Sequence, residues 1–119
     1  MHIKTHTISN SKIAELISDD VLIQSAEDGL DLLGNIYYQD FDKIIIREKN
    51  LSADFFDLKN GMAGEILQKF STYRVRLVIV GDFSKYSSKS LKDFIYESNQ
   101  MKQINFVASL EEALNVLSV

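Results

Sequence analysis

The feature that most constrains this chain is an alternation between short, strongly apolar runs and amphipathic stripes. The runs lie at residues 43–47, 75–80 and 104–108 and are rich in β-branched residues. Uninterrupted runs of strand length are typical of strands covered on both faces. After each run, apolar residues return at three- and four-residue steps, as on one side of a helix. This alternation predicts consecutive βα units and a mainly parallel sheet.

The helical stripes have recognisable starts. One covers residues 60–73, and a second begins at Ser88 or Ser90 and reaches residue 98. Ser109 and Glu112 form a capping box that opens the last helix. Between the first run and the first of these helices, Ser52 is placed to cap a short helical turn within residues 51–58.

The N-terminal part has a different pattern. Residues 3–8 and 12–17 alternate around a turn cluster at 9–11, which predicts a β-hairpin. Ser18, Asp19 and Asp20 then offer an N-cap for an amphipathic helix over residues 21–37. We therefore expect one α/β domain spanning residues 1–119. Its core should nearly fully bury seven side chains: Ile45, Ile66, Leu67, Phe70, Val78, Val80 and Phe106.

Composition excludes several classes of protein. The chain has no Cys, so it holds no disulfide, no thiol nucleophile and no cysteine-based metal centre. The net charge is −4 and the basic residues are scattered, which argues against nucleic acid as a partner. No apolar run approaches the roughly 20 residues of a membrane span, and no signal peptide opens the chain. We expect a cytoplasmic protein with no membrane association.

Polar residues follow the predicted parallel strands, where ligands usually bind in open α/β sheets. The same edge receives the start of the helix at residue 60, whose free N–H groups favour anions. The candidate surface for a ligand or partner comprises Glu48, Asn50, Asp57, Lys59, Asn60, Gly61, Asp82, Ser84 and Lys85. A purely structural interpretation is also open, with Asn60 and Asp82 as turn or cap residues and Lys59 and Lys85 as solvated lysines.

Catalytic motifs are missing. Gly61 and Gly64 lack the third glycine of a dinucleotide-binding loop, and no Walker loop or nucleophile elbow is present. His2 and His6 share the first strand, and we expect both on the surface without a metal. The pairs Phe55–Phe56 and Tyr37–Tyr38 are expected to cover the core, and a ring that faces a partner is the alternative. The sequence thus predicts no catalytic residue, no metal and no cofactor.

Three segments carry a family resemblance. Residues 54–70 (DFFDLKNGMAGEILQKF), 76–83 (RLVIVGDF) and 90–98 (SLKDFIYES) resemble a bacterial family known only as a domain of unknown function. The resemblance covers nearly the whole chain. It implies a bacterial, stand-alone domain and brings no activity with it.

The layout also resembles the STAS domain of sulfate transporters and anti-sigma-factor antagonists. The final segment, residues 109–114 (SLEEAL), is similar to the end of that domain, and residues 58–61 (LKNG) align with its helix opening. Asn60 then stands where the antagonists carry a phosphorylated Ser or Thr. Because Asn cannot accept that phosphate, the resemblance implies a docking face without the kinase-controlled switch.

Two functions remain. The first is a non-enzymatic, STAS-like domain that binds a protein partner or a small anion around residues 59–61 and 82–85. The alternative is a small enzyme or ligand-binding protein that uses the carboxylates of Glu48, Asp57 and Asp82. Self-association into a homo-oligomer is open in both.

Overall fold

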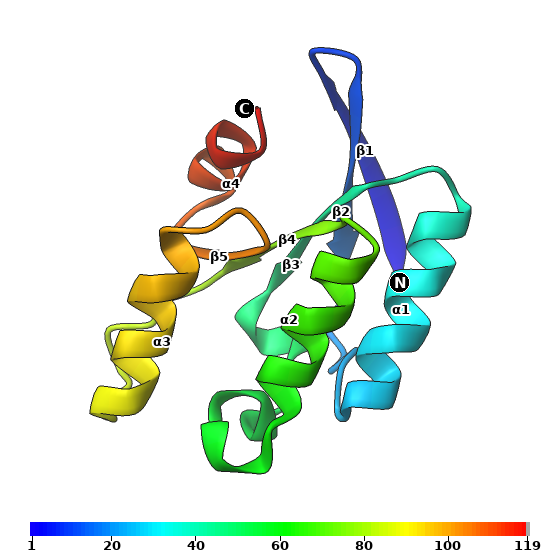
Figure 1. Ribbon diagram of the computed structural model, residues 1–119. Coiled ribbons are helices and arrows are strands. Elements are labelled where there is room, and N and C mark those ends of the chain that lie inside the picture. Colours follow the sequence, from blue (N-terminus) through cyan, green and yellow to red (C-terminus); the bar gives the residue numbers. More distant parts are fainter. Residues whose placement is uncertain (119) are drawn as a thin grey trace.

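The computed structural model describes residues 1–118 and contains one mixed sheet (Figure 1). Its strands follow the order β1-β2-β3-β4-β5, with β1 antiparallel to β2 and the remaining pairs parallel. The predicted hairpin and the predicted parallel sheet are both confirmed. The strand bounds are β1 His2–Ile8, β2 Ser11–Ile17, β3 Lys43–Arg47, β4 Arg76–Val80 and β5 Ile104–Val107.

A two-residue turn closes the hairpin. Ser9 and Asn10 both have positive φ, at 50° and 66°, and Ile8 pairs directly with Ser11 across the turn. Turns of this kind match the right-handed twist of the two strands, and Asn tolerates positive φ well.

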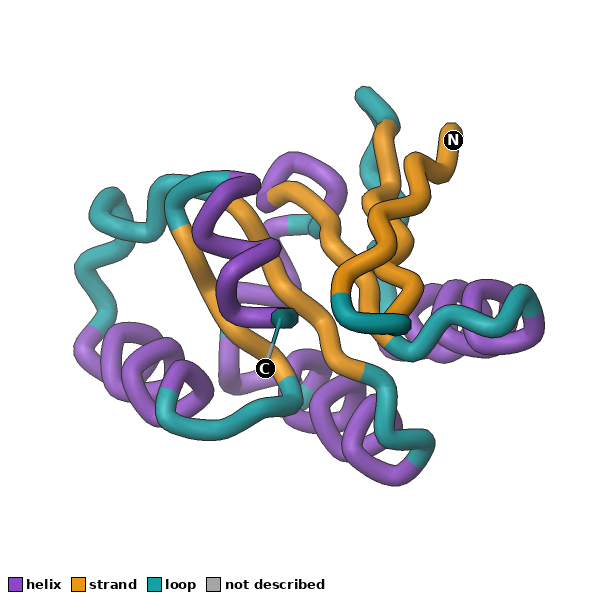
Figure 2. Tube along the Cα trace, turned by 90° about the horizontal axis from the view of Figure 1, so that it is seen from above, coloured by secondary structure: helices purple, strands orange, loops and turns teal. Residues whose placement is uncertain are grey.

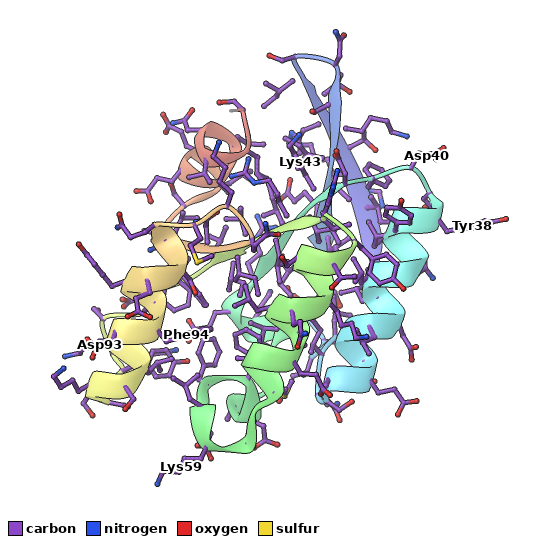
Figure 3. All side chains as sticks on the ribbon, in the orientation of Figure 1. Tyr38, Asp40, Lys43, Lys59, Asp93 and Phe94 are labelled. Atoms are coloured by element: carbon purple, nitrogen blue, oxygen red, sulfur yellow. The ribbon has the colours of Figure 1, made fainter. Side chains whose placement is uncertain are left out.

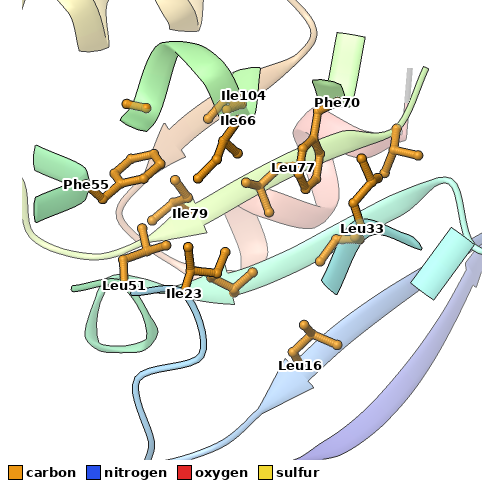
Figure 4. Packing of buried hydrophobic residues seen from close by; sticks show 14 of the residues in the cluster. Leu16, Ile23, Leu33, Leu51, Phe55, Ile66, Phe70, Leu77, Ile79 and Ile104 are labelled. Atoms are coloured by element: carbon orange, nitrogen blue, oxygen red, sulfur yellow. The ribbon is translucent and has the colours of Figure 1, made fainter. Parts of the chain in front are cut away.

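The helices lie in two layers. Helices α1, α2 and α3 cover one face of the sheet, and α4 lies on the other (Figure 2). The three-helix side packs on Leu16, Ile44 and Leu77, as Figure 4 shows in part. Alternate strand residues, including Ile13 and Ile45, are buried on the α4 side. The helix bounds are α1 Ala26–Tyr38, α2 Met62–Thr72, α3 Lys89–Asn99 and α4 Leu110–Leu117, and short 3₁₀ turns are η1 Glu48–Asn50, η2 Ala53–Phe56 and η3 Leu58–Asn60.

The predicted start of the first helix is wrong. Helix α1 begins at Ala26, and its N-cap is Ser25, whose hydroxyl accepts the N–H of Asp28. Residues 18–23 are instead held against η1, where Ile23 bridges to Leu51 and is fully buried. Burial of Ile23 in the core therefore outweighs the capping signal at residues 18–20. Of the two predicted starts of α3, Ser88 and not Ser90 is the N-cap, and the predicted cap at Ser109 is confirmed.

Two of the seven predicted core residues are only half-buried. Leu67 lies at the margin of the apolar stripe of α2, and Val80 is the last residue of β4, where the cover of the sheet ends. The other five are buried.

The two aromatic pairs differ. Phe55 and Phe56 are buried as expected, whereas Tyr37 and Tyr38 are 51% and 89% exposed. The tyrosines end α1, and Figure 3 shows Tyr38 pointing away from the protein. Within residues 1–118, no helix has the length and apolar character needed to cross a membrane.

Candidate functional site

The carboxyl ends of β3 and β4 meet at one edge of the sheet. Glu48 follows β3 directly, and Gly81 follows β4. The turns η2 and η3 lie between β3 and α2, so their residues reach the same region. Figure 3 places Lys59 at the end of the molecule opposite the hairpin turn. We call this region the carboxyl-edge surface, and it comprises Glu48, Asp57, Lys59, Asn60, Gly61, Asp82, Ser84 and Lys85.

Glu48 is held by two other side chains of this region. Its side chain is 14% exposed, and Oε2 accepts hydrogen bonds from the Tyr86 hydroxyl and, at 2.7 Å, from Lys85 Nζ. The Tyr86 ring stacks on Phe56 of η2, with ring centroids 4.9 Å apart. Burial, together with the neighbouring Glu48 carboxylate, raises the pKa of Tyr86 well above its usual value. Tyr86 therefore stays protonated and donates to Glu48 at all physiological pH values.

Asp82 organises its own turn. Its Oδ1 accepts the hydroxyl of Ser84 at 2.6 Å and the backbone N–H of Ser84 at 3.1 Å. Both hydrogen bonds lower the pKa of Asp82, and the bond from the Ser84 hydroxyl has the larger effect. Both side chains are exposed, so the turn remains accessible from solvent.

The segment before α2 is built from local caps. Asp57 accepts the N–H of Lys59, and Asn60 Oδ1 accepts the N–H of Met62 at 2.9 Å. The amide nitrogen of Asn60 donates to the carbonyl of Asp54 at 2.8 Å and so ties η3 to η2. Gly61 has φ of 75°, a conformation that glycine adopts without strain. Lys59 is exposed and makes no ion pair with any residue from 1 to 118.

Asn50 has a different position from the other predicted site residues. It is fully buried, and its Nδ2 donates to the carbonyls of Ser18 and Asp20 at 2.9 and 2.8 Å. Its Oδ1 accepts the N–H of Arg47. All hydrogen-bonding atoms of this side chain are thus used inside the protein, where they hold residues 18–20 against η1.

A family model described as a domain of unknown function (DUF4180) matches residues 8–117. The chain belongs to the DUF4180 family. No curated protein matches the chain, and no solved structure does. For this DUF4180 domain, the arrangement of the carboxyl-edge surface is therefore the main guide to function.

The carboxylates of the DUF4180 domain do not converge at this edge. Glu48 is neutralised by Lys85, Asp82 is bonded to Ser84, and Asp57 caps η3. Among the described residues, no group of three or more His, Asp or Glu side chains is placed to hold a metal ion.

Two residues that connect the surface were not among the sequence candidates. Phe56 and Tyr86 join η2 to the segment after β4 and, with Glu48 and Lys85, line a shallow hollow. Phe56 was expected to cover the core, with a partner-facing position as the alternative, and Tyr86 carried no local signal. Their stacking depends on the approach of segments 30 residues apart, which periodicity alone does not report.

Proposed function

We propose that this DUF4180 member is a non-enzymatic, STAS-like interaction domain of the bacterial cytoplasm that binds a protein partner through the carboxyl-edge surface. The observation that carries the proposal is the set of contacts that fixes this surface. Asn60 links η3 to η2, Phe56 and Tyr86 link η2 to the segment after β4, and Tyr86 with Lys85 hold Glu48. A surface fixed in advance loses little conformational entropy when a partner binds.

The order of elements supports the STAS-like part of the proposal. The hairpin, helix α1 and three βα units follow one another, in keeping with the consecutive βα units that the resemblance implies. Asn60 stands at the aligned phosphorylation position, and its amide already bonds Met62 and Asp54. We therefore expect binding that is constitutive rather than switched by a phosphate at this residue.

The charges of the surface indicate what a partner should present. Lys59 is exposed and unpaired among the described residues, and Lys85 keeps 58% of its side chain exposed beside Glu48. Half-buried Phe83 and Tyr86 add apolar area, and Lys85 Nζ lies over the Tyr86 ring. Apolar area with flanking cations suits a protein segment that combines an apolar anchor with a carboxylate.

A site-specific crosslink tests the proposal. The photoreactive residue p-benzoylphenylalanine replaces Lys59 in one variant and exposed Lys102, near the opposite end of β5, in a matched control. In native host cells, irradiation should join a discrete protein to position 59 and not to position 102. Equal labelling at both positions, or none at 59, would contradict a protein-binding role for this surface. In the latter case, a titration with inorganic phosphate followed by NMR would reveal a small-anion site.

A further inference from the structure

The two edge strands of the sheet differ in how their outer backbone groups are used. The strand order makes β1 one edge and β5 the other. On the β5 edge, the Asn99 side chain bonds both backbone groups of Phe106: its Oδ1 accepts the N–H at 2.8 Å, and its Nδ2 donates to the carbonyl at 3.2 Å. Glu112 accepts the N–H of Ala108, just after the strand. These side chains occupy backbone groups that a further strand would need, so the β5 edge is protected against pairing.

The outer edge of β1 has no such protection within residues 1–118. Strand β1 is seven residues long, contains no Pro and packs chiefly on β2. Its register with β2 is continuous from the pair His2–Ile17 to the pair Ile8–Ser11, so no bulge bends it away. Figure 1 shows the hairpin of β1 and β2 projecting at one end of the molecule. The β1 edge is therefore long, regular and able to accept another strand.

The hairpin turn decides which backbone groups of β1 point outward. A two-residue turn is closed by a hydrogen-bonded pair, here Ile8 and Ser11, and the direction of the backbone groups alternates along an antiparallel strand. The N–H and C=O groups of Ile3, Thr5 and Thr7 therefore point away from β2. No hydrogen bond from another segment within residues 1–118 reaches these groups.

Side chains tie β1 firmly to the rest of the sheet. Glu15 of β2 is 3% exposed, and its two oxygens accept His6 Nε2 of β1 and Arg47 Nη2 of β3, both at 2.7 Å. Burial alone would raise the pKa of Glu15, but the hydrogen bonds from His6 and Arg47 outweigh it and the pKa is lowered. His6 is accordingly half-buried rather than the surface histidine that the sequence predicted. Because β1 is held in place beforehand, the addition of a strand costs little conformational entropy.

The outward groups of β1 are complementary to themselves. When a second β1 lies antiparallel with the two copies of Thr5 directly opposite, Ile3 of each copy faces Thr7 of the other. All the outward groups then lie in hydrogen-bonded pairs, and each such pair exchanges both of its N–H···O=C bonds. Two threonines in direct opposition are a favourable cross-strand pair. Lys4, the one lysine of the strand, is exposed and keeps its ammonium group in water.

We propose that β1 pairs with β1 of a second copy of this chain, antiparallel about a two-fold axis at Thr5, so that one sheet runs through both copies. Pairing of a single strand buries less than the roughly 1,200 Å² of a typical stable interface, so the dimer is weak and reversible. Lys59 lies at the end of the domain opposite the hairpin turn (Figure 3), so the carboxyl-edge surface stays free in both copies. This dimer goes beyond the proposed function and would present two such surfaces to a partner.

A single introduced cysteine tests the register. The chain has no Cys, so Thr5→Cys supplies its one thiol. Opposite residues of a hydrogen-bonded pair have Cα atoms about 5.5 Å apart, a separation that a disulfide spans. Thr7→Cys is the matched control, because Thr7 is exposed on the same side of β1 but would lie roughly 13 Å along the strand from its own copy. Under mild oxidation at equal concentration, Thr5→Cys should form a covalent dimer at least about tenfold faster than Thr7→Cys.

Sedimentation velocity measures the dimer without a covalent link. The wild type should pass from monomer to dimer between about 10 μM and about 1 mM, as expected for a small interface. Thr5→Pro should stay monomeric, because Pro lacks the outward N–H, and it should keep the hairpin, because that N–H does not bond β2. Thr5→Val retains the N–H and should dimerise like the wild type. Urea melts of the variants check that each one is folded.

Three results would overturn the proposal. A wild type that stays monomeric at about 1 mM would mean that the β1 edge does not pair with itself. Equal crosslinking of Thr5→Cys and Thr7→Cys would indicate random collision rather than a defined register. A dimer that persists in folded Thr5→Pro would place the interface on another surface. If Thr5→Pro fails to fold, the comparison of the two cysteine variants decides.

Discussion

Gly81 lies so close to Glu48 that a β-carbon at position 81 would come within 2.6 Å of the Glu48 β-carbon. The end of β4 therefore passes over the residue that anchors Lys85 and Tyr86. A side chain at position 81 would displace Glu48 and with it the contacts that connect the carboxyl-edge surface.

Gly81→Ala should lower the free energy of unfolding by about 1–3 kcal/mol, because the backbone beside Glu48 must move. Urea denaturation measures this change. Gly64→Ala is the matched control, since a β-carbon there meets nothing within 4 Å and the residue lies inside α2. It should raise stability by about 0.5–1 kcal/mol. Equal stability of the two variants would mean that the contact at position 81 relaxes freely.

Asn50→Ala should destabilise the domain by at least about 2 kcal/mol, because the carbonyls of Ser18 and Asp20 and the N–H of Arg47 lose their partner. Thermal and urea unfolding provide the measurement. Asn35→Ala, at an exposed position of α1, should change stability by less than about 0.5 kcal/mol. A small effect at position 50 would argue that residues 18–20 do not depend on this side chain.

Phe70→Ala should lower the free energy of unfolding by about 3–5 kcal/mol, because the Phe70 side chain of α2 is fully buried in the core (Figure 4). Leu67→Ala removes a half-buried side chain of the same helix and should cost clearly less. Denaturant melts of both variants test the orientation of α2. A larger loss of stability for Leu67→Ala than for Phe70→Ala would mean that the Leu67 side of α2 faces the core.

Glu15 should give the domain a pH-dependent stability. Its pKa in the folded chain is lowered from the ordinary value of 4.5, so its contribution is complete above that value. As the pH falls below 4.5 and through the lower folded pKa, the contribution is lost. The stability difference between wild type and Glu15→Gln should therefore shrink on acidification, as measured by urea melts at several pH values. Glu65→Gln, at an exposed position of α2, serves as the control. A difference that stays constant with pH would show that Glu15 gains nothing from His6 and Arg47.

Local patterns predicted most of the fold. Strands such as those around Ile45 and Val78 could be found because their β-branched runs depend only on neighbours in sequence. The same holds for two helix starts, at Ser88 and Ser109, because a cap bonds to residues three positions away. The start of α1 could not be predicted from local patterns. It depends on Asn50, whose side chain holds Ser18 and Asp20, which lie 32 and 30 positions earlier in the chain.

The candidate site shows the same division. Parallel topology alone predicts that Glu48 and Lys85 approach each other at one sheet edge, and their ion pair agrees with this. The stacking of Tyr86 on Phe56 and the burial of Asn50 depend on side-chain packing between distant segments. Glu15 went unnoticed because its strand pattern reads as a polar residue facing solvent, whereas His6 and Arg47 converge on it from neighbouring strands.

The most direct test of the central claim measures capture of the protein that crosslinks at position 59. Quantitative mass spectrometry of co-purified protein compares three forms of the domain. These are the wild type, the Lys59→Ala/Asp82→Ala variant and the charge-matched Lys92→Ala/Asp93→Ala variant on α3. We predict that the first variant loses capture by at least about fivefold, or about 1 kcal/mol, while the control retains it. All three should unfold within about 1 kcal/mol of one another, since these side chains are exposed. Normal capture by the Lys59→Ala/Asp82→Ala variant would contradict the claim that the carboxyl-edge surface is where this domain binds its partner.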